Sequence, residues 1–186
     1  TKDDPYLITS AGHLAYFRNL VDGGNTFKDN IIKLDDNITL SNVNFDPIGW
    51  GYVNAAHNRD GVAGKVFQGT FDGGEYNESG VLVGRHTIFD LCQSGWDLEE
   101  TTGTDYTYTT CGFGLFAAAS NATFKNLTIS GAYVRVECVE AGVLVGLSQN
   151  NCTYNNIKIL NSKIANYQRP AGGLIGEVSG EGTTTI

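Results

Sequence analysis

Charge and long apolar runs are both scarce in this sequence. Only 17% of its 186 residues are charged, and 12 Lys and Arg stand against 20 Asp and Glu, for a formal net charge of −8. This balance disfavours nucleic acid as a partner, because phosphate binding depends on clustered cations. The simplest role of the acidity is solubility. No apolar run reaches the roughly 18 residues of a membrane span, so we expect no membrane insertion.

The usual signatures of metal, cofactor and nucleophile chemistry are also missing. His13, His57 and His86 stand apart from one another, and no HExxH motif occurs. Residues 112–117 match the letters GxGxxA, but strand-like repeats follow where a dinucleotide-binding fold requires a helix. No GxSxG nucleophile elbow occurs. We therefore predict no metal site, no cofactor and no catalytic residue.

The four cysteines, Cys92, Cys111, Cys138 and Cys152, do not have the spacing of paired CxxC zinc ligands. Cys92 and Cys111 bracket a stretch that lacks the repeat described below, so a disulfide between them is one prediction. Buried free thiols are the alternative, because an exported protein tolerates either state.

What the chain does contain is a motif that recurs at a fixed spacing. Val143–Gly146 recurs thirty positions later as Gly173–Gly176, and Phe124–Ile129 recurs with the same shift as Tyr154–Ile159. A fixed period of this size is the signature of stacked repeats, in which each unit buries its apolar face against its neighbours.

Two earlier segments are similar to the same motif. Gly114–Ala117 is a partial copy in which Ala replaces the last Gly, and Gly80–Gly84 repeats Gly142–Gly146 letter for letter at a less regular spacing. Within the regular repeats, Asn126 and Asn156 fall in register, and we expect their side chains to hydrogen-bond along the stack.

Each repeat contains three short stretches of β-branched or aromatic residues bounded by Gly, Asn or Ser, which predicts three strands and no crossover helix. We therefore predict an all-β, right-handed parallel β-helix-like solenoid. Ser10 is a good N-cap for an amphipathic helix over residues 11–21, whose apolar face would cap the open end of the core. Residues 93–110 break the period and are interpreted as one irregular loop insertion.

These features divide a single repeat solenoid, residues 1–186, into consecutive parts. The parts are an N-terminal strand and helix cap (1–30), irregular first coils (31–92), the loop insertion (93–110) and regular thirty-residue repeats (111–186). Because residues 183–186 begin a further coil, we expect the repeats to continue past Ile186.

At these residues the chain resembles the GLUG-motif family of bacterial surface proteins, named for Gly-Leu-hydrophobic-Gly. Gly173–Gly176 matches that motif fully, and Val143–Gly146 and Gly114–Ala117 match it with one substitution each. Similar N-terminal motifs are Asp4–Ser10, Leu14–Phe17, Gly23–Gly24, Pro47–Gly49 and Phe67–Gly73. Proteins of that family, often from Bacteroides-type gut bacteria, are described as adhesins or surface proteins. The resemblance implies an extracellular or outer-surface location and supplies no catalytic residues.

The candidates for ligand binding are aromatic residues in or near the irregular segments, because loops on a rigid scaffold carry function more often than the scaffold does. Tyr and Trp offer a broad contact area with a polar handle, which suits carbohydrate or protein ligands. The alternative is that these rings cover the edge of the core. The candidates are Trp50, Tyr52, Trp96, Tyr106 and Tyr108.

We therefore expect a non-catalytic, secreted or cell-surface module for adhesion or ligand display, with a host glycan or a matrix or surface protein as partner. Two alternatives stay open. One is a passive structural stalk that binds no ligand. The other is a carbohydrate-active enzyme or polysaccharide-binding domain; such an enzyme needs two carboxylates at one cleft, although Asp is also common in turns. The candidate carboxylates are Asp35, Asp36, Asp46, Asp60 and Asp72.

Overall fold

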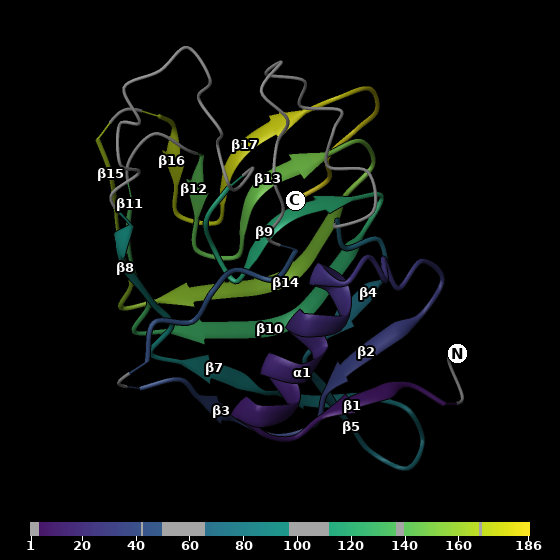
Figure 1. Ribbon diagram of the computed structural model, residues 1–186. Helices are drawn as coiled ribbons and strands as arrows, with labels where there is room; N and C mark the ends of the chain where they lie inside the picture. The colour runs from purple at the N-terminus through teal and green to yellow at the C-terminus, as the bar shows by residue number, and fades with distance from the viewer. Residues whose placement is uncertain (1–3, 42, 50–65, 97–111, 137–139, 168) are drawn as a thin grey trace.

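The computed structural model describes residues 4–41, 43–49, 66–96, 112–136, 140–167 and 169–186. Within these residues the protein is mostly β-structure with a single α-helix, as Figure 1 shows. The strands form four parallel sheets and one antiparallel hairpin. The prediction of an all-β protein is confirmed.

Two consecutive repeats supply the regular part of the fold: the first repeat, residues 123–149, and the second repeat, residues 153–179. Each contributes one strand to each of the four parallel sheets, and paired residues such as Thr123 and Thr153 lie thirty positions apart. The predicted period is therefore confirmed by the strand register. The strands are β10 (Thr123–Ser130), β11 (Tyr133–Val136), β12 (Ala141–Gly142) and β13 (Val145–Gln149), then β14 (Thr153–Leu160), β15 (Lys163–Asn166), β16 (Ala171–Gly172) and β17 (Ile175–Ser179).

The third strand predicted in each repeat is in fact two short strands with a bend between them, such as β12 and β13. A Cβ atom at Gly142 would clash with the carbonyl oxygen of Val145, so the bend is too tight for a larger residue. A Cβ atom at Gly146 would lie 2.5 Å from the backbone nitrogen of Phe113 in the neighbouring strand segment. The glycines of the recurring motif thus allow backbones to approach closely.

Strands before the first repeat extend the same sheets. β4 pairs with the first half of β10 and β7 with its second half, while β8 pairs with β11 and β9 with β13. Residues 31–92, expected to be irregular, therefore contain strands with regular parallel pairing. The strands before the first repeat, apart from the hairpin, are β1 (Tyr6–Ile8), β2 (Ile31–Leu34), β3 (Ile38–Thr39), β4 (Thr70–Asp72), β7 (Thr87–Phe89), β8 (Cys92–Trp96) and β9 (Phe116–Ser120).

Two expectations from the sequence are wrong in detail. Gly80–Gly84 is not a copy of the repeat, because it lies in the antiparallel hairpin of β5 (Gly74–Tyr76) and β6 (Leu82–Arg85). The same five letters are buried between parallel strands at 142–146, whereas Val81 and Val83 of the hairpin are more than half exposed. Residues 93–96, assigned to the loop insertion, belong to β8 and extend its pairing with β11.

Asparagine occupies many of the corners where the backbone is left-handed. Asn126 and Asn156 have φ of 54° and 57° and bend β10 and β14 in mid-strand, and Asn121 and Asn150 have the same conformation after β9 and β13. Asn tolerates this region because its short side chain hydrogen-bonds locally. The predicted asparagine stack is confirmed, since the Asn156 amide donates to Asn126 Oδ1 at 2.8 Å.

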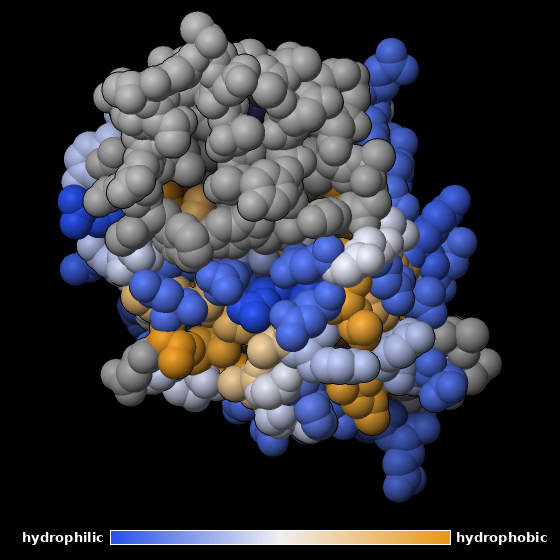
Figure 2. Space-filling view, viewed as in Figure 1, coloured by the Kyte–Doolittle hydropathy of each residue, from blue (hydrophilic) through white to orange (hydrophobic). Residues whose placement is uncertain are grey.

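The helix α1 (Ala11–Asp22) packs its apolar face against an aromatic interior. Its predicted N-cap is confirmed, because the backbone N–H of His13 donates to the Ser10 hydroxyl at 3.1 Å. Leu14, Phe17 and Val21 are buried, as their spacing predicted. Figure 2 shows that the hydrophobic residues on this face of the molecule form small groups among hydrophilic ones. The Phe17 ring contacts the rings of Phe27, Phe67, Phe71 and Phe116.

None of the described helical segments has the length and apolar character needed to cross a membrane. α1 has 12 residues and carries Arg18 and Asp22, which are 4.0 Å apart.

Candidate functional site

Most of the predicted ligand-binding aromatics lie outside the described residues. Trp50 and Tyr52 fall in residues 50–65, and Tyr106 and Tyr108 fall in residues 97–111, whereas Trp96 is the last residue of β8. We call residues 50–65 the first insertion and residues 97–111 the second insertion. The described residues that flank these two segments define the candidate site.

β9 supports both flanks of the first insertion. The Ile48 N–H donates to Leu115 O at 2.9 Å, and the Ile48 carbonyl accepts from the Ala117 N–H at 2.8 Å. On the far side, the Phe67 carbonyl accepts from the Ser120 N–H at 3.0 Å. The chain thus leaves one end of β9 and returns at the other end of the same strand. β9 also begins shortly after the second insertion. The same strand is therefore adjacent to the flanks of both insertions.

A buried glutamine links the two insertions. Gln93 on β8 is fully buried, and its Nε2 donates to Phe45 O at 2.9 Å and to Gly114 O at 2.8 Å. Phe45 precedes the first insertion and Gly114 follows the second, so one side chain holds both flanks. Gln93 Oε1 is buried and has no hydrogen-bond partner among the described residues. An unpaired buried oxygen is costly, which makes this amide an unusual feature of the interior.

Sequence reasoning missed Gln93, although a signal existed. Gln93 pairs with Val134 of β11, which in turn pairs with Ile164 of β15. A polar residue in an otherwise apolar inward-facing row needs hydrogen-bond partners inside the protein. Once the register is known, Gln93 is therefore recognisable as a buried anchor.

The C-terminal end of α1 holds the flank of the first insertion from the other side. The Gly49 N–H donates to Asp22 Oδ1 at 2.9 Å. Arg18 Nη1 lies 3.3 Å from Asp46 Oδ2, and its guanidinium lies over the Phe45 ring at 5.3 Å from the centroid. Each contact joins the helix to the segment just before the insertion, so this flank is fixed on two sides.

The carboxylates considered for hydrolytic chemistry have local structural partners instead. Asp72 is buried, and its oxygens accept from the Gly74 N–H at 2.9 Å, the Tyr76 hydroxyl at 2.8 Å and Lys125 Nζ at 3.1 Å. Burial, and then the neighbouring Asp72, raises the pKa of the Tyr76 hydroxyl. With its oxygens occupied by donors, Asp72 anchors the β5–β6 hairpin to β10.

The other candidate carboxylates resemble Asp72 in this respect. Lys33 Nζ lies 2.6 Å from Asp35, Asp36 accepts from the backbone N–H of Asn37 at 2.7 Å, and Asp46 pairs with Arg18. Asp60 lies outside the described residues. Across the described ranges, no cluster of three His, Cys, Asp or Glu residues is arranged to hold a metal ion.

Two of the four cysteines, Cys92 and Cys152, lie in the described part of the chain. Among the described residues, neither Cys92 nor Cys152 forms a disulfide, and Cys152 is buried. The Cys92 thiol contacts Asn44 Oδ1 at 3.5 Å. Cys111, the predicted partner of Cys92, and Cys138 lie outside the described residues, so the pairing stays a prediction.

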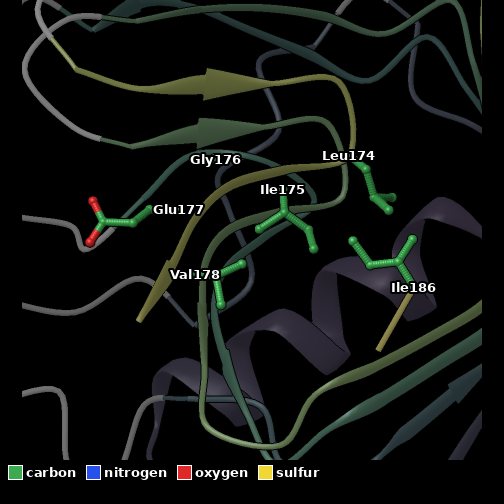
Figure 3. A pocket seen from close by; sticks show the side chains of 6 residues that line it. All are labelled: Leu174, Ile175, Gly176, Glu177, Val178 and Ile186. Carbon is green, nitrogen blue, oxygen red and sulfur yellow. The ribbon is translucent and has the colours of Figure 1, made fainter. Parts of the chain in front are cut away.

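An apolar hollow lies at the open end of the second repeat, shown in Figure 3. Its volume is about 270 Å³. The side chains of Leu174, Ile175 and Ile186 point toward one another, whereas Glu177 points away. Thr185 pairs with Thr153, so the last residues lie along the outer edge of β14. The hollow marks where the stack of strands ends, and it lacks the converging polar groups of a catalytic pocket.

Comparisons of this chain with models of known protein families, with curated proteins and with solved structures found no match.

Proposed function

We propose that this chain is a non-catalytic module for adhesion or ligand display at the outside of a bacterial cell, and that its insertions carry the ligand site. The single observation behind the proposal is the common support of both insertions. Ile48 and Phe67 pair with β9, and Gln93 hydrogen-bonds to both flanks. Binding segments held by a rigid scaffold lose less entropy when they engage a ligand.

We further propose that the four parallel sheets are the faces of a right-handed parallel β-helix. The thirty-residue register and the left-handed asparagine corners support this architecture, since each repeat turns at the same positions. The resemblance to GLUG-motif surface proteins supports the same architecture and an extracellular location.

The two rival functions make different predictions. A carbohydrate-active enzyme needs a pair of carboxylates at one cleft, and the ion pairs that Asp72, Asp35 and Asp46 form with Lys or Arg argue against these residues in that role. A passive stalk does not require aromatic-bearing segments whose flanks share one supporting strand, so the shared support favours display.

The test is binding of the whole chain to arrays of glycans and of matrix proteins, compared with a variant in which residues 97–111 are replaced by a short Gly-Ser linker. This replacement keeps β8 and Gln93 intact. The matched control shortens the exposed β5–β6 turn at residues 77–80. We expect saturable binding that the linker variant loses at least about tenfold and that the control keeps.

Three results would count against the proposal. Absence of binding by the intact chain would favour the stalk. Equal binding by the linker variant would place the site outside residues 97–111. Turnover of a polysaccharide that disappears when two of the candidate carboxylates are changed to Asn would favour the enzyme.

A further inference from the structure

A second exposed cluster lies on the outer face of the sheet β15-β11-β8, apart from the insertion flanks. Tyr133 and Arg135 project outward from β11, because they alternate along the strand with the buried Val134 and Val136. Lys163 and Ala165 are their register partners on β15. Tyr167 follows β15 and is 62% exposed. We call these five residues the tyrosine–arginine face.

The guanidinium of Arg135 is held between two tyrosines. It lies over the Tyr167 ring at 5.5 Å from the centroid, in a cation–π contact. Tyr167, and then Tyr133, raises the pKa of the Arg135 guanidinium. The register partner of Arg135 is Ala165, whose single methyl group leaves room for the guanidinium to reach diagonally to Tyr167. The arrangement fixes a fully exposed cation between two exposed rings.

The described charged residues of this face are positive, whereas the whole chain carries a net negative charge. Arg135 and Lys163 lie on it, and the exposed Arg169 follows two residues after Tyr167. Among the described residues, no carboxylate forms an ion pair with any of the three cations. Because the chain carries a net charge of −8, an anionic ligand is repelled elsewhere and is attracted to such a local group of cations.

The shape of the face restricts the kind of anion. Tyr133 and Tyr167 are about four residues apart along the strands, or roughly 13 Å at about 3.3 Å per residue. An extended ligand with flat apolar faces can stack on both rings while its acidic group binds the guanidinium in a bidentate manner. A folded protein partner requires a buried apolar centre larger than two separate rings.

We propose that the tyrosine–arginine face binds an acidic saccharide, that is, a chain of sugars bearing carboxylate or sulfate groups. The sugar faces stack on Tyr133 and Tyr167, and Arg135 with Lys163 binds the acidic groups. This inference goes beyond the proposed display function because it uses none of the residues of the insertions. It shares with that function only the premise that the chain binds ligands.

The test measures binding of the whole chain to an oligogalacturonate and to a heparin oligosaccharide, with a neutral galacto-oligosaccharide as the comparison. We expect binding to at least one acidic probe, weaker binding as salt rises, and little binding to the neutral one. Arg135→Gln should weaken binding about tenfold or more, since a hydrogen bond to a charged group is lost. Tyr167→Ala should weaken it several-fold, and Tyr167→Phe should retain most of it.

The matched control is Lys158→Gln, which removes one exposed positive charge from β14 in a different sheet of the same repeat. It should leave binding unchanged, and thermal unfolding checks that every variant is folded. The linker variant of residues 97–111 should also bind the acidic probe normally, which separates this inference from the display proposal.

Several results would overturn the inference. These are equal binding of neutral and acidic saccharides, equal losses for Lys158→Gln and Arg135→Gln, no binding of either acidic probe, or binding of a poly-glutamate peptide without binding of a saccharide. The last result would make the face a site for acidic peptides.

Discussion

The first and second repeats have the same pattern of apolar residues and differ in what lies beside them. In the first repeat the inward-facing residues are completely buried: Leu127, Ile129, Val134, Leu144 and Val145. Their equivalents in the second repeat are only partly buried: Ile157, Ile159, Ile164, Leu174 and Ile175. Strands lie on both sides of the first repeat, whereas among the described residues only Thr185 pairs along the outer edge of the second.

This difference indicates that the burial of a residue in these repeats depends more on the strands on either side than on the sequence of its own repeat. In the proposed repeat solenoid, stability is a sum of intrinsic terms and nearest-neighbour interfaces. Within the described residues, strands flank the first repeat on both sides and the second repeat on one side. Equivalent substitutions in the two repeats should therefore have unequal effects, and the second repeat should open first.

The largest difference is expected for truncation of an apolar side chain. Leu127→Ala removes a fully buried side chain and should lower the free energy of unfolding by about 2–5 kcal/mol. Ile157→Ala, at the equivalent position of the second repeat, should cost roughly half as much or less, because water already reaches the side chain. Urea unfolding followed by far-ultraviolet circular dichroism measures both. Equal losses would show that the outer edge of the second repeat is covered in solution.

Glycine substitutions should show whether a glycine is needed because another backbone segment lies close to it or only because it makes the chain flexible. Gly146→Ala places a Cβ atom 2.5 Å from a backbone nitrogen and 2.6 Å from other backbone atoms of the adjoining strand segment. Because those atoms cannot move aside without shifting the sheet, we expect a loss of about 1–3 kcal/mol. Gly173→Ala is the control, since no atom lies within 4 Å of its added Cβ, and it should change stability by about 0.5 kcal/mol at most. A neutral Gly146→Ala would contradict the tight packing of this motif.

The asparagine stack offers a third comparison of the two repeats. Asn126 donates to the Tyr76 hydroxyl at 2.9 Å and accepts from Asn156, whereas Asn156 has only the bond to Asn126 among the side-chain bonds of the described residues. Asn126→Ala should cost about 2 kcal/mol, since it combines a left-handed backbone with lost hydrogen bonds, and Asn156→Ala about 1 kcal/mol.

Asn126→Gly is the variant that separates the two causes, because glycine accepts the left-handed backbone without a side chain. It should recover about half of the loss caused by Asn126→Ala. Thermal unfolding of the three variants side by side gives the comparison. Identical losses for Asn126→Ala and Asn126→Gly would mean that the hydrogen bonds account for the whole effect.

The sequence predicted the parts of the fold that repeat and failed where a tertiary contact decides. The thirty-residue register, the helix capped by Ser10 and the stacked asparagines all follow from local patterns. The stretch at 80–84 was misassigned because identical letters form a hairpin where no parallel strands flank them.

The candidate site was less accessible to sequence reasoning. Four of the five aromatic candidates lie in the insertions, where no period constrains the chain. The anchoring by Gln93 depends on a register that only the fold reveals. The tyrosine–arginine face joins Arg135 of β11 to Tyr167, which follows β15; the thirty-residue period brings their segments together, but the contact between the two side chains is visible only in the structure.

The smallest change in the free energy of unfolding is expected for Tyr76. Its hydroxyl accepts from Asn126 on the side of Asn126 opposite to Asn156, and so extends the asparagine stack. Tyr76→Phe removes the hydroxyl that donates to Asp72 and accepts from Asn126, and it should cost about 1 kcal/mol at pH 7. Because the pKa of Tyr76 is raised in the folded protein, its stabilisation is complete below the unfolded value of 10.0 and is lost as the pH rises further. The difference in the free energy of unfolding between wild type and Tyr76→Phe should therefore decrease above about pH 10. Urea unfolding of both proteins from pH 7 to 11 tests this. Taking the difference between their free energies of unfolding at each pH removes the contribution of the other tyrosines, which both proteins share. If the difference in the free energy of unfolding stayed constant from pH 7 to 11, the Tyr76 hydroxyl would not contribute to stability through its hydrogen bonds to Asp72 and Asn126.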